Sequence, residues 1–383
     1  MKPISKKILI TSFGTPFTDP RPKKMIDYLS PENAVITLSD DQELNKSNSF
    51  KLGFYGLRRG SQFYFKLLRA FLTILRNISF LGKLKELLNS ILHGYLFKIK
   101  IKEFSDLDLI ICHDLSLLSF VIKLKEKSSK NLEVIFDARE YYPKQFENSL
   151  NFRILYSKEN ERICKKYLHK CDKVLTVSHG ISDKYYDDFK IKPSVMFSAP
   201  NFRKMDVNSA SKSTFKAVHH GVANKNRQIE KMIEVFENCD ERFSLDLYLN
   251  GDQNYINFLR NFISSDKVRI KKPVRYDLII DTLKKYDVGV CYYEPLDFNV
   301  KHCLPNKFFE FMQARLSIFT GPSVEMTKII NEFNCGFYSE EFSVSSCVKK
   351  INAIDSNEIL KHKIGSNKAA HKYNFENEIV KVF

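Results

Sequence analysis

The chain has 383 residues, 43% of them hydrophobic and 28% charged, which suits a globular protein of two domains and argues against a disordered chain. Its formal net charge of +16 favours a polyanionic partner: phosphorylated substrates, an anionic membrane surface or nucleic acid. The sequence has no zinc-finger spacing and no aromatic RNA-binding signature, so nucleic acid is the weakest of the three.

The cysteines and the hydropathy of the chain indicate the cellular compartment of the protein. The eight cysteines form no Cys-x-x-Cys pair and several lie in apolar runs, so we expect buried, reduced thiols in a cytosolic protein. The first residues lead directly into a strand pattern without a signal-peptide core, and no run of about 18 apolar residues predicts a transmembrane helix.

The first half of the chain alternates buried strand patterns with helical ones. Apolar runs predict strands at 7–12, 34–38, 107–112, 132–136 and 173–178, and Gly14 lies in the loop after the first of them. This order is typical of a Rossmann-like parallel sheet, which binds ligands at the carboxyl ends of its strands. The absence of a Gly-x-Gly-x-x-Gly run argues against a nicotinamide dehydrogenase.

Polar residues follow two of these strands. His113 and Asp114 end one strand, and the run from Asp137 through Arg139 to Glu140 ends the next. Parallel strands carry these residues to one rim of the sheet, where a site can form. The alternative is that Asp114 and Glu140 cap helices or form loop ion pairs.

Residues 51–104 form a basic amphipathic insertion, with eleven Lys or Arg against two Glu and apolar residues every three or four positions. Such a segment can lie on an anionic bilayer. The alternative is a pair of helices packed on the sheet with ordinary basic outer faces.

The pattern restarts after a polar linker at 203–214 and continues to about residue 365. Strands are predicted at 215–220, 245–249, 268–270 and 286–293, with a final helix at 366–383 expected to cross back to the first domain (1–202). Gly221 opens a loop that ends at Arg227 before a helix, where the helix dipole favours an anion. Gly251 and Val274 lie in the loops after the next two strands.

The stretch 304–321 carries the strongest signal. Pro305 and Asn306 are expected to start and cap a helix, which is followed by a short buried strand. Lys307 and Glu310, three residues apart, project from one side of the helix near its electropositive start, where they could bind a phosphate and a sugar hydroxyl. A surface ion pair on an amphipathic helix is the alternative.

The run Pro-Asn-Lys-Phe-Phe-Glu-Phe-Met, with the strand after it, resembles the nucleotide-sugar-binding segment of GT-B glycosyltransferases, especially the retaining family 4. The resemblance implies an α/β fold of two Rossmann-like domains whose parallel sheets face each other across a cleft. It also implies that Lys307 and Arg227 bind the donor diphosphate and that Glu310 binds the ribose. The other expected donor-binding positions are Gly14, Gly221, Gly251 and Val274.

The sequence departs from that family at two positions. Arg139 stands where the family has a histidine near the transferred sugar, and His302 stands where it has the first of two glutamates eight residues apart. We expect Asp114, Arg139, Glu140 and His302 to be the catalytic candidates. Glu294 and Asp297 are alternatives to His302 for orienting the sugar.

The resemblance therefore predicts a retaining transferase that moves a sugar from a nucleotide-diphosphate sugar, with UDP the expected nucleotide, to a glycan or polyprenyl-diphosphate-linked acceptor in capsule or O-antigen synthesis. No cofactor or metal is expected, because the sequence has no His/Cys ligand cluster. The expected location is the cytoplasm, with peripheral contact to the inner leaflet through 51–104. The alternatives are a GT-B sugar-nucleotide epimerase, a degenerate nucleotide-sugar-binding protein and a basic nucleic-acid binder.

Overall fold

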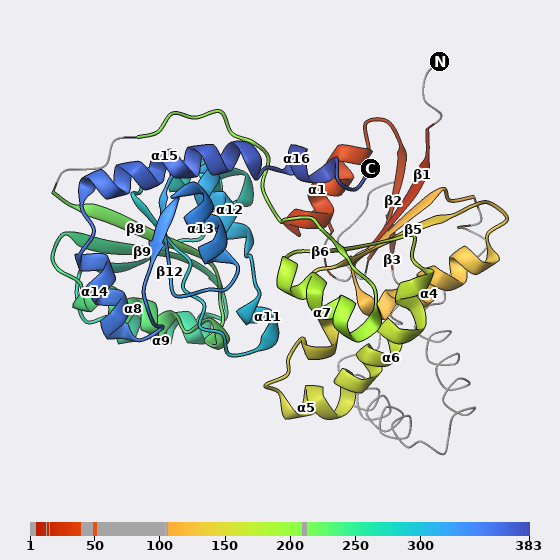
Figure 1. Cartoon of the computed structure of the whole chain (residues 1–383), viewed down its shortest axis with the longest axis horizontal. Helices are drawn as coiled ribbons and strands as arrows, with labels where there is room; N and C mark the ends of the chain where they lie inside the picture. Colours follow the sequence, from red (N-terminus) through yellow and green to blue (C-terminus); the bar gives the residue numbers. More distant parts are fainter. Residues whose placement is uncertain are drawn as a thin grey trace. The chain divides into compact units, whose positions relative to one another are not determined.

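The computed structural model describes residues 5–12, 14, 16–39, 49–51, 104, 106–208 and 213–383. The chain divides into two compact units, one of Met1–Val177 and Ile181–Val195 and the other of Ser178–Gly180 and Met196–Phe383 (Figure 1). The second unit thus begins at 196, ahead of the predicted end of the first domain at 202. The helices predicted for the basic insertion 51–104 lie outside the described residues.

The first unit is built on a parallel sheet of seven strands in the order β3-β2-β1-β4-β5-β6-β7. Its inner strands are buried on both sides, which explains their continuous apolar runs. The strands are β1 (Lys7–Thr11), β2 (Ala34–Ser39), β3 (Ser49–Lys51), β4 (Leu109–Cys112), β5 (Glu133–Ala138), β6 (Lys173–Thr176) and β7 (Ser194–Val195).

Helices follow these strands. The Asp19 side chain caps the first helix by accepting a hydrogen bond from Arg21 N, and Pro20 occupies the first helical position. The helices are α1 (Pro20–Leu29), α4 (Leu115–Lys127), α5 (Leu150–Phe152), α6 (Lys158–Tyr167) and α7 (His179–Phe189), with short turns at η3 (Tyr142–Lys144), η4 (Arg153–Ser157) and η5 (Leu168–Lys170).

The second unit has a parallel sheet of six strands in the order β10-β9-β8-β11-β12-β13. The predicted strands of this half are all present, and β8 and β9 are longer than the sequence indicates. The strands are β8 (Phe215–Ala223), β9 (Phe243–Gly251), β10 (Val268–Lys271), β11 (Val288–Val290), β12 (Ser317–Thr320) and β13 (Gly336–Tyr338).

Helices cover both sides of this sheet (Figure 1). Helices α8, α9 and α14 form one apolar core with β8 and β9, and α12 and α15 pack together on the other side. The helices are α8 (Ile229–Asn238), α9 (Gln253–Phe262), α10 (Ile279–Leu283), α11 (Phe298–Lys301), α12 (Asn306–Gln313), α13 (Met326–Phe333), α14 (Val344–Asn352), α15 (Ser356–Lys372) and α16 (Phe375–Ile379), with turns at η6 (Lys225–Arg227) and η7 (Tyr276–Leu278).

The end of the chain is anchored within the second unit. Helix α15 is continuous from Ser356 to Lys372, so the predicted start of a terminal helix at 366 falls inside it. Helix α16 then contacts the segment 196–202, with which the chain enters this unit. Glu378 accepts a hydrogen bond from Phe197 N, and Glu376 accepts one from Phe202 N. None of the described helices is long and apolar enough to cross a membrane.

In both sheets the strand order reverses once, between β1 and β4 and between β8 and β11. Helices on opposite faces of a parallel sheet leave a crevice at the carboxyl ends of the strands where the order reverses, and ligands bind there. Side chains at those strand ends are therefore the first candidates for a site.

Candidate functional site

Lys307 and Gly221 lie together at the reversal point of the second sheet. Lys307, in the first turn of α12, places its Nζ 3.2 Å from Nε2 of the buried His219 on β8. Two residues further along β8, Gly221 has φ +133°, and a Cβ at this position would lie 2.8 Å from Lys307 Nζ. A side chain at 221 would thus occupy the place of the lysine head group.

His219 orients this lysine. Its Nδ1 lies 2.8 Å from the carbonyl oxygen of Val290, which can only accept, so Nδ1 carries the proton and donates. Burial, reinforced by Lys307, holds the pKa of His219 well below its ordinary value, so the ring is neutral and Nε2 accepts from the ammonium of Lys307. The histidine therefore fixes the lysine without neutralising its charge.

Tyr293 brings a second cation to the same place. The Arg227 guanidinium lies 4.9 Å from the centre of the Tyr293 ring, and Lys307 Nζ lies 5.4 Å from it. Arg227 reaches this position because η6 ends in Gln228, which has a left-handed backbone (φ +49°), just before α8. We call Gly221, Arg227, Tyr293, Lys307 and His219 the Lys307 cluster.

No carboxylate among the described residues forms an ion pair with Lys307 or Arg227. Burial, together with the nearby Arg227, lowers the pKa of Lys307 to about 8 against the opposing effect of Cys291 and Glu310. Holding two cations beside one buried ring without a counter-ion costs free energy, and a bound anion would offset that cost.

Glu310 lies one turn further along α12 and is 3% exposed. Its Oε2 is 3.1 Å from Nε2 of His220, but the two groups are not aligned as a hydrogen bond, and Nε2 has no hydrogen-bond partner. The His220 ring stands edge-on to Phe311, 5.5 Å away. Lys307 and Glu310 therefore lie next to two consecutive histidines of β8, His219 and His220.

The other expected donor-binding residues are placed differently. Gly251 ends β9 beside Ala223 with φ +105°, and a Cβ there would lie 3.0 Å from Val222 Cγ1, so it adjoins the strand end that carries Gly221. Val274 is partly exposed in the loop between β10 and η7 and makes none of the contacts of the Lys307 cluster. Gly14, with φ +83°, follows β1 in the first unit.

In the first unit, Arg139 joins two carboxylates that precede helices, Asp19 before α1 and Asp114 before α4. Its Nη1 pairs with Asp19, and its Nη2 lies 3.4 Å from Asp114 Oδ1. Asp114 precedes α4 but makes no capping hydrogen bond with its side chain. The backbone oxygen of Glu140 accepts a hydrogen bond from the Tyr185 hydroxyl. Asp114, Arg139 and Asp19 thus form one ion-pair chain at the predicted rim.

Next to this chain lies a buried ion-pair group that includes Asp137 and His113, which the sequence places at the strand ends without predicting a role for either. Asp137 accepts two hydrogen bonds from Arg21, at 2.6 and 2.7 Å, and one from His113 Nδ1 at 2.8 Å. Burial alone would raise the pKa of Asp137, but Arg21 and His113 hold it well below the ordinary value. Nε2 of His113 is buried without a hydrogen-bond partner.

His302, at the end of α11, contacts a carboxylate that sequence reasoning misses. Its Nδ1 lies 3.4 Å from Oε1 of Glu325, which is 2% exposed and accepts a hydrogen bond from Gly180 N at 2.8 Å. The two alternatives to His302 have other partners: Glu294 pairs with Lys231, and Asp297 caps α11 through Val300 N.

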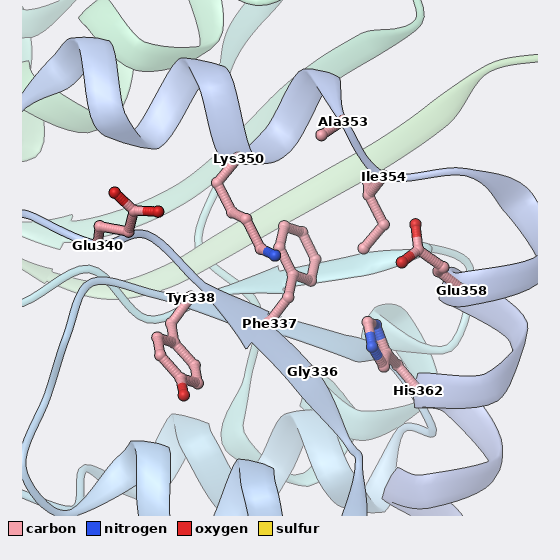
Figure 2. A pocket seen from close by; sticks show the side chains of 9 residues that line it. All are labelled: Gly336, Phe337, Tyr338, Glu340, Lys350, Ala353, Ile354, Glu358 and His362. Atoms are coloured by element: carbon pink, nitrogen blue, oxygen red, sulfur yellow. The ribbon is translucent and has the colours of Figure 1, made fainter.

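A separate pocket of about 370 Å³ lies beside the edge strand β13, between α14 and α15 (Figure 2). His362 points into it and stacks on Phe337, with the ring centres 5.7 Å apart, while Lys350 and Glu358 line its rim (Figure 2). Burial lowers the pKa of His362 to about 4, so this ring is neutral. None of the predicted site residues lines this pocket.

One feature could have led from the sequence to some of the missed residues. His219 and His220 follow an apolar run immediately before a glycine, where polar residues are unusual unless they serve a site. Glu325 has no such local signal, because its contact with His302 depends on how two helices pack. Within the described ranges, no cluster of three or more His, Cys, Asp or Glu side chains could hold a metal ion.

The comparisons with known proteins concern structure only, since no protein-family model and no curated protein matches the sequence. Anabaena HepE in complex with UDP and glucose matches with a TM-score of 0.66 and 12% identity over 98% of both chains. A glycosyltransferase from Rickettsia africae matches with a TM-score of 0.64 and 13% identity over 99% of this chain and 97% of its own.

Staphylococcus aureus TarM, solved with UDP, matches with a TM-score of 0.55 and 14% identity over 71% of this chain, which spans only 54% of TarM. At these identities the similarities show the fold alone. The chain has the α/β GT-B fold of these structures, with a parallel sheet in each of its two units, and this predicted fold class is confirmed.

Proposed function

We propose that this protein is a glycosyltransferase whose second unit binds a nucleotide-diphosphate sugar at the Lys307 cluster. The observation that carries the proposal is that Lys307 and Arg227 lie over one Tyr293 ring and that no carboxylate of the described residues pairs with either. A diphosphate supplies the missing negative charge, and Gly221 leaves room for it to approach the backbone.

The chemistry follows from the same groups. When the glycosidic bond to the donor breaks, negative charge develops on the leaving diphosphate, and preorganised cations stabilise it. Glu310 has a buried carboxylate within reach of the same strand end and would accept hydrogen bonds from the ribose hydroxyls. UDP is the proposed nucleotide, because HepE and TarM were both solved with UDP in folds like this one.

The first unit is proposed to bind the acceptor. Its rim carries Asp114, Arg139 and Glu140 at the ends of β4 and β5, while His302 of the second unit is proposed to orient the transferred sugar. Retention of configuration, membership of family 4 and a lipid-linked glycan acceptor in surface-polysaccharide synthesis rest on the sequence resemblance. The cytoplasmic location rests on the cysteine usage, and the contact of 51–104 with the membrane rests on the basic amphipathic pattern of that segment.

The test is calorimetric titration of the wild type with UDP, GDP, ADP and CMP, repeated with Lys307→Ala. The matched control is Lys349→Ala, which removes an exposed lysine of the same unit from α14. We expect one nucleoside diphosphate to bind the wild type and the control, and to bind Lys307→Ala at least about tenfold more weakly, the effect of losing roughly 1.4 kcal/mol.

Two results would separate the proposal from its alternatives. If the folded wild type binds none of the nucleotides, the transferase and epimerase hypotheses both fail. If it binds one but neither hydrolyses nor transfers the sugar of the matching donor, the protein is a degenerate nucleotide-sugar-binding protein.

A further inference from the structure

A second pocket, of about 520 Å³, opens near the amino ends of β8, β9 and β10, whereas the Lys307 cluster lies at the carboxyl end of β8. Six cationic side chains and two carboxylates line this pocket, so its lining has a net charge of +4. The carboxylates are Glu241 and Asp246, and the cations are Lys216, Arg242, Lys267, Arg269, Lys271 and Lys285.

The pocket exists because one face of β9 is only partly covered. Along this strand Phe243, Leu245 and Leu247 are buried in the core with α8 and α9, whereas the alternate residues Ser244 and Asp246 are partly exposed. A strand covered on both faces by helices would be apolar throughout, so this alternation marks a face left open to solvent.

Three of the six cations have local counter-charges. Arg242 pairs with Asp240 at 3.0 Å and Lys267 with Glu241 at 3.4 Å. Lys271 lies 3.8 Å from Asp246, whose carboxylate also accepts a hydrogen bond from the Tyr286 hydroxyl at 2.7 Å. The two carboxylates of the pocket are therefore already engaged.

The other three cations have no such partner. Among the described residues, Lys216 and Lys285 form no ion pair, and the guanidinium of Arg269 donates only to a backbone carbonyl, that of Asp266, at 3.1 Å. Three uncompensated positive charges around one concave surface repel each other and attract anions. Arg269 also offers the planar donor fork that matches a phosphate group.

We propose that this pocket is a binding site for a small, soluble, multiply phosphorylated anion, bound mainly by Lys216, Arg269 and Lys285. A concave volume of about 520 Å³ suits a ligand with two or three linked phosphates better than a flat bilayer surface does. The site is separate from the Lys307 cluster, and the proposal does not depend on the proposed transferase activity.

The test uses tripolyphosphate as the probe and calorimetric titration at about 150 mM salt, where weak surface attraction is screened. The full-length chain carries Arg227→Ala and Lys307→Ala, so that the Lys307 cluster cannot contribute. We expect saturable binding of one tripolyphosphate per chain. Adding Lys216→Gln, Arg269→Gln and Lys285→Gln is expected to weaken that binding by about tenfold or more.

The control removes the same charge elsewhere on the unit, with Lys349→Gln, Lys361→Gln and Lys368→Gln, all at exposed positions. This variant is expected to bind as tightly as its parent, and thermal unfolding of all variants checks that they are folded. Equal weakening by both triple substitutions would attribute binding to overall charge and overturn the proposal, as would the absence of any binding.

A membrane surface is the other binding partner of this pocket that the experiment must exclude. If vesicles of phosphatidylglycerol bind the parent but not the pocket variant, and tripolyphosphate binds neither, the face is a lipid-binding surface and the small-ligand proposal is wrong. The nucleotide titration of the wild type depends on Lys307 and not on this pocket, so failure of either proposal leaves the other testable.

Discussion

Lys307 Nζ lies next to Gly221: a Cβ added to this glycine would lie 2.8 Å from Nζ and 3.4 Å from Cε of Lys307. The glycine also has φ +133°, where a side chain strains the backbone. Residue 221 therefore controls where the cation of α12 sits, although the two positions are 86 residues apart in the sequence.

The first prediction is that Gly221→Ala weakens nucleoside diphosphate binding by about tenfold or more, because the added methyl group displaces Lys307. Calorimetric titration measures this loss. A double-mutant cycle is the control: if the alanine acts through the lysine, Gly221→Ala adds little further loss in a Lys307→Ala background. Fully additive losses would show that the glycine acts independently of Lys307.

The second prediction concerns pH. With a pKa of about 8, Lys307 loses its proton in the free protein as the pH rises from 7 to 9. A bound diphosphate favours the charged form, so binding takes up a proton near pH 8, and affinity falls by up to roughly tenfold at pH 9. Titrations in buffers of different ionisation enthalpy measure the uptake.

Lys307→Ala supplies the control for this pH dependence. The terminal phosphate of the ligand has its own pKa near 6, so above pH 7 the ligand contributes little to proton uptake. The variant should therefore bind weakly with an affinity that is nearly constant between pH 7 and 9. A wild type whose affinity does not change over that range would contradict the assignment.

The third prediction is that Asp137→Asn destabilises the first unit by about 3–5 kcal/mol, because it removes the buried carboxylate charge that pairs with Arg21. Chemical denaturation followed by circular dichroism measures the loss. Asp27→Asn, which removes an exposed partner of Lys23 on α1, should leave stability nearly unchanged.

The pH dependence of this stabilisation has a defined sign. The pKa of Asp137 is lower in the folded protein than in the unfolded chain, where it is about 4. The carboxylate therefore stabilises the fold fully above about pH 4, and this stabilisation is lost progressively as the pH falls below that value. The difference in stability between wild type and Asp137→Asn should therefore shrink on acidification below about pH 4. A difference that stays constant down to pH 3 would mean that the carboxylate charge is not what stabilises the unit.

The sequence predicts the elements around the site well, because they depend on local patterns. Phe308, Phe311 and Met312 recur at helical spacing and are all fully buried in α12. The predicted cap is wrong in detail: Pro305 is the N-cap residue and makes no side-chain cap hydrogen bond, and Asn306 is already helical. A proline fixes its own backbone for the approach to the helix, which moves the start by one residue.

The contacts that define the site are harder to predict, since they join distant parts of the chain. Arg139 pairs with Asp19, 120 positions away, and Lys307 meets His219, 88 positions away. No periodicity encodes such partners. They follow only once the strand order places the ends of β8 and β11, or of β1, β4 and β5, side by side.

The last prediction separates binding from turnover at His302. In the part of the chain that the structure describes, His302 forms no hydrogen bond or ion pair with the Lys307 cluster, and its imidazole lies 3.4 Å from the buried carboxylate of Glu325. If it orients the transferred sugar, His302→Gln should bind the nucleoside diphosphate within about twofold of the wild type while release of nucleotide from the donor falls by roughly 100-fold, the usual effect of losing a positioned polar group. Lys307→Ala should instead lose binding.

Glu325→Gln tests whether that carboxylate positions His302. The amide oxygen of glutamine can still accept the hydrogen bond from Gly180 N, so the fold is expected to survive, but the charge facing the imidazole is removed. Turnover is then expected to fall, because the imidazole loses the carboxylate that holds it, while nucleotide affinity stays the same. An unchanged rate would assign Glu325 a structural role, and His302 would then act without it.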